Sequence, residues 1–261
     1  MCNYLDKDFT DIAEKAFTDR GIKISTGEKV VKFEGIDGEV NKIITDKGEY
    51  EADMVIMCVG FRPNTEIFKG QLDMLPNGAI NVDEYMRTSD KDVMAAGDCC
   101  SVFFNPTREH MYIPLATNAV RMGTLAAINI VEDKIKHPGT QGTSGIKIYE
   151  NNMASTGITE ETAKHLGIDA DFVYAVDNYR PEFMPTYEKV TLKVVFERES
   201  RRILGAQLTS KADLTQSINT ISVCIQNNMT VDQLAFIDFF FQPHYNKPWN
   251  FINLAGLNAL K

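Results

Sequence analysis

Two apolar runs, each ending in a glycine, place the strongest limit on the fold of this chain. The first covers residues 54–59 (MVIMCV) and stops at Gly60, and the second covers 92–98 (DVMAAGD) and ends in Gly97 and Asp98. A continuous apolar run without alternation is typical of a strand that is buried on both faces of an α/β sheet. Ligands of such sheets bind beyond the carboxyl ends of the strands. We therefore expect an α/β part with a ligand site close to Asp98.

The composition is that of a soluble globular protein, and it excludes several classes of partner. The 261 residues suffice for one large domain or two ordinary ones, with 44% apolar and 24% charged residues. A net charge of −9 without a basic cluster argues against nucleic-acid binding through phosphate contacts. No apolar run approaches the ~18 residues of a membrane span, and residues 1–7 lack the apolar core of a signal peptide. We expect no nucleic acid, no membrane association and a reducing cytoplasm as the compartment.

The five cysteines show no pattern of a metal site or of a disulfide framework. They are Cys2, Cys58, Cys99, Cys100 and Cys224, and no two of them have the spacing C-x-x-C. Cys99 and Cys100 are adjacent, which suits neither tetrahedral metal ligation nor an easy disulfide. We expect all five to be inert residues of the core or the surface, and we expect no metal site.

The amino-terminal part predicts one helix followed by short strands. Apolar residues recur at helical spacing within 9–17, with aspartates before them and Gly21 after them as end signals. Runs with strand character follow, separated by glycine turns, at 22–24, 30–33, 40–45 and 50–59. The chain leaves the sheet at 61–64 (FRPN), where we place a crossover between domains.

The carboxyl-terminal half has an α+β pattern. A long helix is predicted for 114–132, and 136–142 (KHPGTQG) has the composition of a linker. Strands are predicted at 146–149, 153–156, 172–176, 190–196 and 203–208. Helices are predicted at 159–166 and 214–225, and Thr230 with Gln233 forms a capping box for a further helical turn. We expect a sheet with helices on one face.

The second apolar run and the helix after it suit a cofactor in two places. Gly97 lets the backbone approach a ligand closely, and the carboxylate of Asp98 can accept hydrogen bonds from a sugar-alcohol hydroxyl. Pro114 suits the first turn of a helix, whose free N–H groups and dipole favour electron-rich groups such as the N1–C2=O2 edge of a reduced flavin. An ordinary turn and an ordinary capped helix are the alternatives for each feature taken alone.

A series of motifs runs in a fixed order along the chain. The first four are 59–65 (VGFRPNT), 86–89 (MRTS), 93–98 (VMAAGD) and 113–119 (IPLATNA). Three more follow at 141–145 (QGTSG), 203–208 (ILGAQL) and 238–250 (DFFFQPHYNKPWN). The series resembles the pyridine nucleotide-disulfide oxidoreductase superfamily, most closely its NADH oxidase and NADH peroxidase branch, and the last three motifs resemble that branch's dimerisation domain. The resemblance covers essentially the whole chain.

The resemblance implies roles for five residues and two cofactors. It places Asp98 at the flavin ribityl chain, and Ala116, with Leu115 beside it, at the isoalloxazine ring. It places Gly60 and Pro114 near the bound nicotinamide nucleotide. The implied cofactors are FAD and NADH, with NADH reducing the flavin and the reduced flavin passing electrons to oxygen or peroxide.

The resemblance also divides the chain into three parts. Residues 1–63 would finish an NADH-binding domain, 64–137 would form the second segment of an FAD-binding domain, and 138–261 would form an α+β dimerisation domain. The family's two G-x-G-x-x-G fingerprints, and its redox cysteine that cycles through sulfenic acid, have no counterpart in this sequence. We therefore expect the chain to begin part-way through the NADH-binding domain, and to bind FAD weakly or not at all by itself.

An aromatic segment near the carboxyl end suits packing in the core or at the interface of a homodimer, and the alternative is that it reaches toward the flavin pocket of the partner subunit. It contains 239–241 (FFF) and Trp249, and interfaces are enriched in aromatic residues. His244 in this segment is a candidate for proton delivery to reduced oxygen, with a purely structural role as the alternative.

Three functions stay open at this point. The motifs at 112–123 and 177–186 look most like those of a water-forming NADH oxidase. An NADH peroxidase, which reduces hydrogen peroxide, has nearly the same carboxyl-terminal motifs. A non-catalytic module for dimerisation and cofactor support is the third possibility.

Overall fold

The computed structural model describes residues 4–261, which form two compact units. One unit comprises the described residues up to 13 together with 63–261, and the other comprises 14–62. The helix α1 (Lys7–Thr18), which confirms the helix predicted over 9–17, runs from the first unit into the second. No helix of the described chain is long and apolar enough to cross a membrane.

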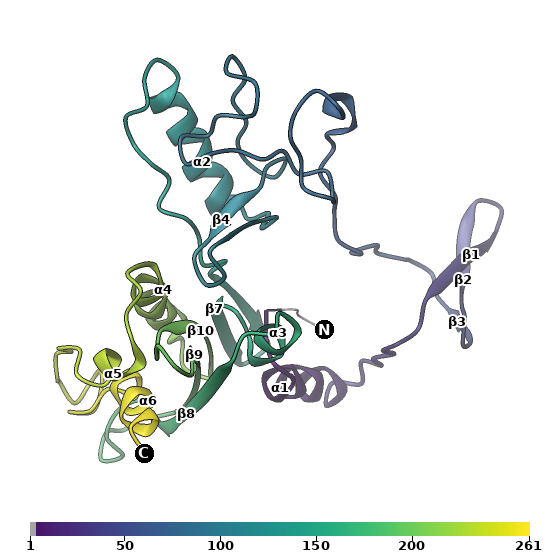
Figure 1. Ribbon diagram of the computed structural model, residues 1–261. Helices are drawn as coiled ribbons and strands as arrows, with labels where there is room; N and C mark the ends of the chain where they lie inside the picture. Colours follow the sequence, from purple (N-terminus) through teal and green to yellow (C-terminus); the bar gives the residue numbers. More distant parts are fainter. Residues whose placement is uncertain (1–3) are drawn as a thin grey trace. The chain divides into compact units, whose positions relative to one another are not determined.

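The unit 14–62 carries a three-stranded antiparallel sheet (Figure 1). Its strands, in spatial order, are β1 (Val30–Ile36), β2 (Glu39–Thr45) and β3 (Glu49–Glu51). Asp37 and Gly38 close the first hairpin with φ angles of 54° and 87°, because a tight two-residue turn needs left-handed backbone at both positions. The strands predicted at 30–33 and 40–45 are confirmed, whereas 22–24 forms no strand.

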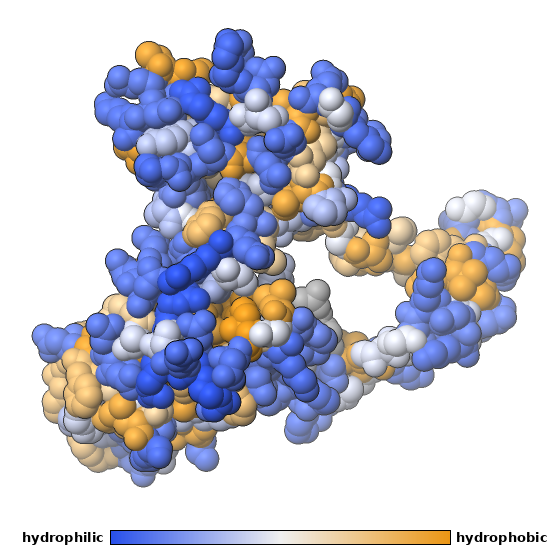
Figure 2. Space-filling view, viewed as in Figure 1, coloured by the Kyte–Doolittle hydropathy of each residue, from blue (hydrophilic) through white to orange (hydrophobic). Residues whose placement is uncertain are grey.

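The apolar run at 54–59 is not the buried strand that its sequence predicts. It has no regular secondary structure, and the exposed fractions of Ile56 and Val59 are 79% and 86%. A strand of this kind needs neighbours that pair its backbone and cover both of its faces, and the sheet β1–β2–β3 supplies neither. Figure 2 shows the segment as apolar surface. The prediction therefore failed on burial: the side chains have the expected character, but nothing in the described chain covers them.

Residues 63–137 form a compact layer on one long helix. The elements are η1 (Glu66–Phe68), the hairpin β4 (Val102–Phe104) with β5 (Glu109–Met111), and α2 (Ala116–Asn129), which confirms the helix predicted over 114–132. Their core contains Ile80, Val82, Met86, Cys100, Val102, Met122 and Leu125. The second apolar run is not a regular strand either, because only Met94 forms an isolated bridge, with Arg87.

A five-stranded antiparallel sheet dominates residues 138–261. Its spatial order is β6–β7–β10–β9–β8, and all five predicted strands are confirmed. The bounds are β6 (Ser144–Ile148), β7 (Asn151–Gly157), β8 (Ala170–Asn178), β9 (Lys189–Glu197) and β10 (Ile203–Ser210). The helices are α3 (Glu160–His165), η2 (Thr215–Ser217), α4 (Ile218–Gln226), α5 (Val231–Leu234) and α6 (Phe251–Ala259).

Helices cover both faces of this sheet, which corrects the expectation of one covered face. Leu192 and Val194 of β9 point into the main core, where α4, α5 and α6 gather against the sheet (Figure 1). Val195 points to the opposite face and packs with Ala163 of α3 in a smaller core. Strand side chains alternate between faces, so β9, buried along nearly its whole length, must be covered on both.

A buried lysine on the smaller face joins the start of the chain to the sheet. The Lys193 side chain is only 2% exposed, and its Nζ lies 2.8 Å from Asp6 Oδ2 and 2.7 Å from Glu160 Oε2. Burial by itself would lower the pKa of Lys193, but these hydrogen bonds outweigh burial and raise it. Burial by itself would raise the pKa of Asp6, but hydrogen bonds from Lys193, Gln207 and the Glu161 backbone hold it below its ordinary value. The pair therefore stays ionised.

Candidate cofactor site

The structure brings Gly97 and Asp98 against the start of α2. Gly97 has a φ of 87°, and a Cβ placed on it would lie 3.6 Å from the Cβ of Ala119, in the first turns of α2. The backbone before Asp98 therefore packs on the helix, while the Asp98 carboxylate is exposed. The positive φ explains the glycine, because residues with a side chain rarely adopt it, and the 3.6 Å separation is an ordinary packing contact with the helix.

The first turn of α2 offers N–H groups that no side chain caps. Leu115 is the N-cap residue, with extended backbone (φ −137°, ψ 136°) and no side-chain capping hydrogen bond. The helical ladder begins with the Ala119 N–H donating to the Leu115 carbonyl, so the N–H groups of 116–118 precede it. Pro114 lies just before the N-cap rather than in the first turn. Free N–H groups at a helix start favour electron-rich ligand atoms.

A buried amide braces the loop that leads into α2. Asn118 Nδ2 donates to the Ile113 carbonyl at 3.0 Å, and its Oδ1 accepts from Thr140 Oγ1 at 2.9 Å and from Arg121 Nη2 at 2.6 Å. Asn118 is 2% exposed, so these hydrogen bonds are protected from water. They hold the turn before Ala116 in one position, which preorganises the helix start for a ligand.

Two neighbours of Asp98 were not recognised as site residues in the sequence. Burial, and then the charges of Asp98 and Cys99, raise the pKa of Tyr112, which places this phenol within electrostatic reach of both groups. Cys99 is half-buried and follows Asp98 directly. Tyr112 is part of the 112–123 motif, so the signal existed for it, whereas no pattern marked Cys99.

Gly60 and His244 are the two predicted site residues that do not belong to this cluster. Gly60 belongs to the unit 14–62, where it is exposed and has a φ of 87°, and a Cβ placed on it would meet no atom within 4 Å. His244 is exposed, its Nδ1 contacts the Gln242 side chain, and its carbonyl accepts from Arg180 Nη1 at 2.8 Å. Their predicted roles in nucleotide binding and proton delivery remain predictions.

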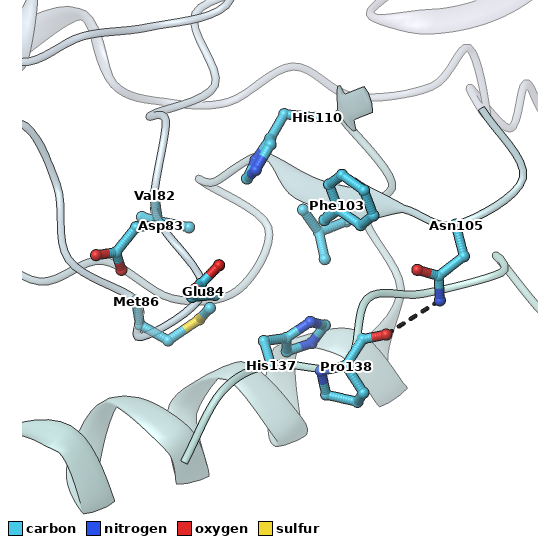
Figure 3. Close-up of a pocket in the computed structure, with 10 residues that line it drawn as sticks. Val82, Asp83, Glu84, Met86, Phe103, Asn105, His110, His137 and Pro138 are labelled. Carbon is cyan, nitrogen blue, oxygen red and sulfur yellow. Dashed lines mark hydrogen bonds between the residues drawn. The ribbon is translucent and has the colours of Figure 1, made fainter. Parts of the chain in front are cut away.

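A separate cavity of about 250 Å³ lies between the β4–β5 hairpin and the segment after α2 (Figure 3). His137, 8% exposed, forms part of its wall. The Gly139 N–H donates to His137 Nδ1 at 3.0 Å, which puts the proton of the neutral ring on Nε2, a buried atom without a hydrogen-bond partner. Burial, and then the positive charges of Arg121 and His110, lower the pKa of His137 to about 4. The ring is therefore a neutral donor at neutral pH.

Aromatic and amide side chains complete the cavity. Phe103 and His110 meet edge to face, with ring centroids 5.7 Å apart, and Asn105 Nδ2 donates to the Pro138 carbonyl at 3.1 Å (Figure 3). Asp98 is not part of this wall. The cavity and the Asp98 cluster are thus two distinct features, and only the second has a recognisable sequence pattern.

Comparison with family models assigns nearly all of the chain. A model described as pyridine nucleotide-disulphide oxidoreductase matches residues 1–123, and a model of the dimerisation domain of the same oxidoreductases matches residues 143–250. The first match contains Gly97, Asp98 and the start of α2. The second contains the whole five-stranded sheet.

Individual relatives agree with the family models. An NADH oxidase of Enterococcus faecalis is 55% identical over 259 residues, which are 99% of this chain and 58% of the relative. An NADH oxidase of Streptococcus pyogenes is 45% identical over 99% of this chain and 57% of its own length. The solved structure of a water-forming NADH oxidase from Lactobacillus brevis bound to NADH superposes with a TM-score of 0.96 at 48% identity, over 99% of this chain and 57% of that chain. The chain therefore spans somewhat more than half the length of these relatives.

Proposed function

Because this chain belongs to the pyridine nucleotide-disulphide oxidoreductase family, we propose that the protein oxidises NADH with the help of FAD and reduces oxygen to water. The observation that carries the proposal is the similarity over 99% of the chain to NADH oxidases. The Asp98 cluster, which lies within the residues that the family model matches, supports it. Reduction of hydrogen peroxide instead of oxygen is the alternative outcome of the test below. The four described cysteines are free thiols, which supports a reducing cytoplasm as the compartment.

The residues of the cluster fit a flavin. Asp98 is an exposed carboxylate that can accept hydrogen bonds from the ribityl hydroxyls, and the turn before it packs on Ala119 of α2 through Gly97. The uncapped N–H groups after Leu115 and Pro114, starting with that of Ala116, suit the electron-rich edge of the isoalloxazine ring. The flavin, when bound, supplies the two-electron chemistry that links NADH to oxygen. Gly60 is the residue that we assign to the nicotinamide nucleotide.

The start of α2 can favour the reduced cofactor through electrostatics. A helix start carries the equivalent of roughly half a positive charge, and its effect on an adjacent anion is about 0.3–1 kcal/mol, rising to about 2 kcal/mol where the group is partly buried. The Asn118 hydrogen bonds keep these dipoles in place, so they need not reorient when negative charge develops. Leu115 and Ala116 thus contribute through their backbone rather than through their side chains.

Flavin binding tests the role of Asp98. We expect Asp98→Asn to raise the dissociation constant for FAD by roughly 10–100-fold, because a hydrogen bond to a charged acceptor is worth about 1.5–3 kcal/mol. The measurement is a titration of FAD followed by flavin fluorescence, at protein concentrations high enough to detect the weak binding that the sequence leads us to expect. Asp92→Asn is the matched control, because it removes an exposed carboxylate of the same segment that pairs only with surface Lys91. Equal affinities of both variants and the wild-type protein would contradict the assignment.

The electron balance tests the reaction. Water formation consumes two NADH for each oxygen molecule, whereas formation of hydrogen peroxide consumes one. We expect the ratio of two from parallel recording of NADH absorbance and oxygen concentration, with no peroxide accumulating. NADH oxidation that depends on added hydrogen peroxide and not on oxygen would favour the peroxidase instead.

We also propose that the carboxyl-terminal domain forms a homodimer through its aromatic segment. Within this segment, Phe240 and Trp249 are 69% and 50% exposed in the single chain. Aromatic residues are typically buried at the centre of an interface once a partner covers them. A second copy of the chain would cover them. We expect Phe240→Ser to shift sedimentation equilibrium toward the monomer, and we expect no shift for Phe33→Ser, which removes an exposed phenylalanine from the unit 14–62. A monomeric wild-type protein would refute this interface.

A further inference from the structure

Two neighbouring thiols lie directly after Asp98, in the turn that packs on α2. Cys99 Sγ and Cys100 Sγ are 3.4 Å apart and both are free. Cys99 is half-buried, whereas Cys100 is 3% exposed and belongs to the core beneath α2. The pair therefore joins one thiol that small solutes can reach with one that is sheltered.

The contact shifts the pKa values of the two sulfurs in opposite directions. The hydrogen bond between the two sulfurs lowers the pKa of Cys99, and this effect outweighs burial and the nearby charge of Asp98. The same hydrogen bond and burial raise the pKa of Cys100. Cys224 shows what burial does to a cysteine with no such partner, since its pKa rises to about 11. The contact therefore favours ionisation of the accessible sulfur over the sheltered one, although the neutral Cys99 thiol also has a hydrogen-bond acceptor in the Ala96 carbonyl, 3.4 Å from its Sγ.

We propose that Cys99 and Cys100 form a redox site that hydrogen peroxide oxidises reversibly to a vicinal disulfide. The oxidant is peroxide supplied from solution, so the proposal stands apart from the NADH oxidase activity and does not require a flavin. Cys99 is the residue that peroxide attacks, and Cys100 is the residue that resolves the product. The 3.4 Å contact allows both steps to occur without a second protein molecule.

The chemistry balances in two steps. In the first, the Cys99 thiolate attacks one oxygen of hydrogen peroxide, the O–O bond breaks, and hydroxide leaves with the second oxygen, so Cys99 becomes a sulfenic acid. In the second, Cys100 gives its proton to that hydroxide, which becomes water, and its sulfur attacks the Cys99 sulfur. The S–O bond breaks as the S–S bond forms, and the departing hydroxide takes a proton from solvent as the second water. Two electrons pass from the sulfurs to peroxide.

The disulfide formed in this way is strained, and the strain makes it reversible. Adjacent Cα atoms are about 3.8 Å apart across a trans peptide, whereas disulfides usually join Cα atoms about 4.4–6.8 Å apart. Strained disulfides have higher reduction potentials and are the labile or regulatory ones. Because Cys99 follows Asp98, closing the ring also changes the backbone that presents the Asp98 carboxylate. Oxidation of the pair is thereby coupled to the candidate cofactor site.

Mass spectrometry of the whole chain tests the proposal. The background carries Cys2→Ser and Cys58→Ser, because Cys58 is exposed and would react on its own account. After peroxide treatment and blocking with N-ethylmaleimide, we expect the peptide with residues 99 and 100 to lose the mass of two hydrogen atoms and to regain it with dithiothreitol. In this background, Cys100→Ser should stop at a sulfenic acid that dimedone labels, and Cys99→Ser should show neither product. Cys224→Ser, which removes the other buried thiol, should behave as the background does.

Two results would overturn the proposal. One is a peptide that peroxide leaves unchanged, and the other is a wild-type pair that stops at a dimedone-reactive sulfenic acid without losing the two hydrogens. Trp249 fluorescence confirms that each variant is folded, and Cys100→Ala replaces Cys100→Ser if serine disrupts the core.

The pH dependence of the reaction gives a second readout. A lowered pKa keeps a larger fraction of Cys99 ionised at pH 6 than of an ordinary thiol, whose pKa is about 8.5. We therefore expect Cys99 to react faster than a free cysteine peptide at pH 6, and we expect the advantage to shrink as the pH rises toward about 8.5. Equal rates would count against the thiolate that the first step needs.

Discussion

Replacing Lys193 by methionine should destabilise the unit that contains the five-stranded sheet. The substitution keeps an unbranched side chain of similar length between Phe172 and Tyr174, whose rings lie 4.5 and 5.5 Å from Nζ. It removes the charge that faces Asp6, which is 5% exposed. Breaking a buried ion pair by removing one partner costs about 3–5 kcal/mol, because the remaining charge is left buried without its counterion.

The donors that remain around Asp6 place the expected loss at the lower end of that range. Gln207 Nε2 still donates to Asp6 Oδ2 at 2.6 Å, and the backbone N–H groups of Glu160 and Glu161 donate at 3.2 Å each. We therefore expect Lys193→Met to lower the free energy of unfolding by about 3 kcal/mol at pH 7. Asp6→Asn in the same chain should recover part of this loss, because the variant no longer buries an unpaired charge.

Urea unfolding followed by the fluorescence of Trp249, the single tryptophan, measures the effect in the relevant unit. Lys15→Met is the matched control, because Lys15 pairs with Asp19 on the surface of α1 and its loss should change the free energy of unfolding by less than about 0.5 kcal/mol.

The folded-state pKa of Asp6 is lowered, so the stability from its ion pair is present above the unfolded pKa of about 3.9 and is lost as the pH falls through the folded value. The difference between wild type and Lys193→Met should narrow in that acid range. A loss below about 1 kcal/mol at pH 7 would refute the reasoning.

Two further predictions concern positions where the structure determines whether a substitution raises or lowers the free energy of unfolding. Gly205→Ala should lower the free energy of unfolding in urea by about 2–3 kcal/mol, because its Cβ would lie 2.0 Å from the Ile158 carbonyl oxygen. Gly123→Ala in α2 should raise the free energy of unfolding by about 0.5–1 kcal/mol, because its Cβ would meet no atom within 4 Å. Equal effects of the two substitutions would contradict the packing argument. His137→Asn keeps an acceptor for the Gly139 N–H but does not titrate. The pKa of His137 is about 4 in the folded protein and about 6.5 in the unfolded chain, so the wild-type protein should lose up to about 3 kcal/mol more stability than the variant between pH 6.5 and 4. Parallel pH profiles of the two proteins would show that His137 is not buried as described.

Local patterns predicted most of the carboxyl-terminal fold. The capping box of Thr230 and Gln233 is present at α5 with both of its hydrogen bonds, since such a cap depends only on two residues within one helical turn. The helix α6 was missed, although Asn250 caps it through a hydrogen bond from the Ile252 N–H. Gly256 inside α6 weakens the sequence signal, yet a Cβ there would lie 2.3 Å from the Ala235 backbone nitrogen. Close packing, which no local pattern reports, explains that glycine.

Burial and long-range contacts limited the prediction elsewhere. The run 54–59 has the composition of a central strand, but a central strand depends on neighbours that lie far away in sequence. The Asp98 cluster was partly predictable, because its glycine and the start of α2 each carry a local signal. The buried charge of Lys193 was not predictable, because its partner Asp6 lies far away in the sequence, near the start of the described chain. The opposite pKa shifts of Cys99 and Cys100 likewise follow from a contact rather than from their spacing.

The exposed run 54–59 has a consequence for the behaviour of the protein at high concentration. Its six residues carry no charge and no proline, and they include the β-branched Val55, Ile56 and Val59. Short segments of this kind, with free backbone groups, are templates for pairing with the same segment of another molecule, and they nucleate amyloid-like aggregation. Self-association through this run would grow with concentration and consume folded protein. The substitution Ile56→Lys would act as a gatekeeper against it, at a position where the side chain is already in solvent.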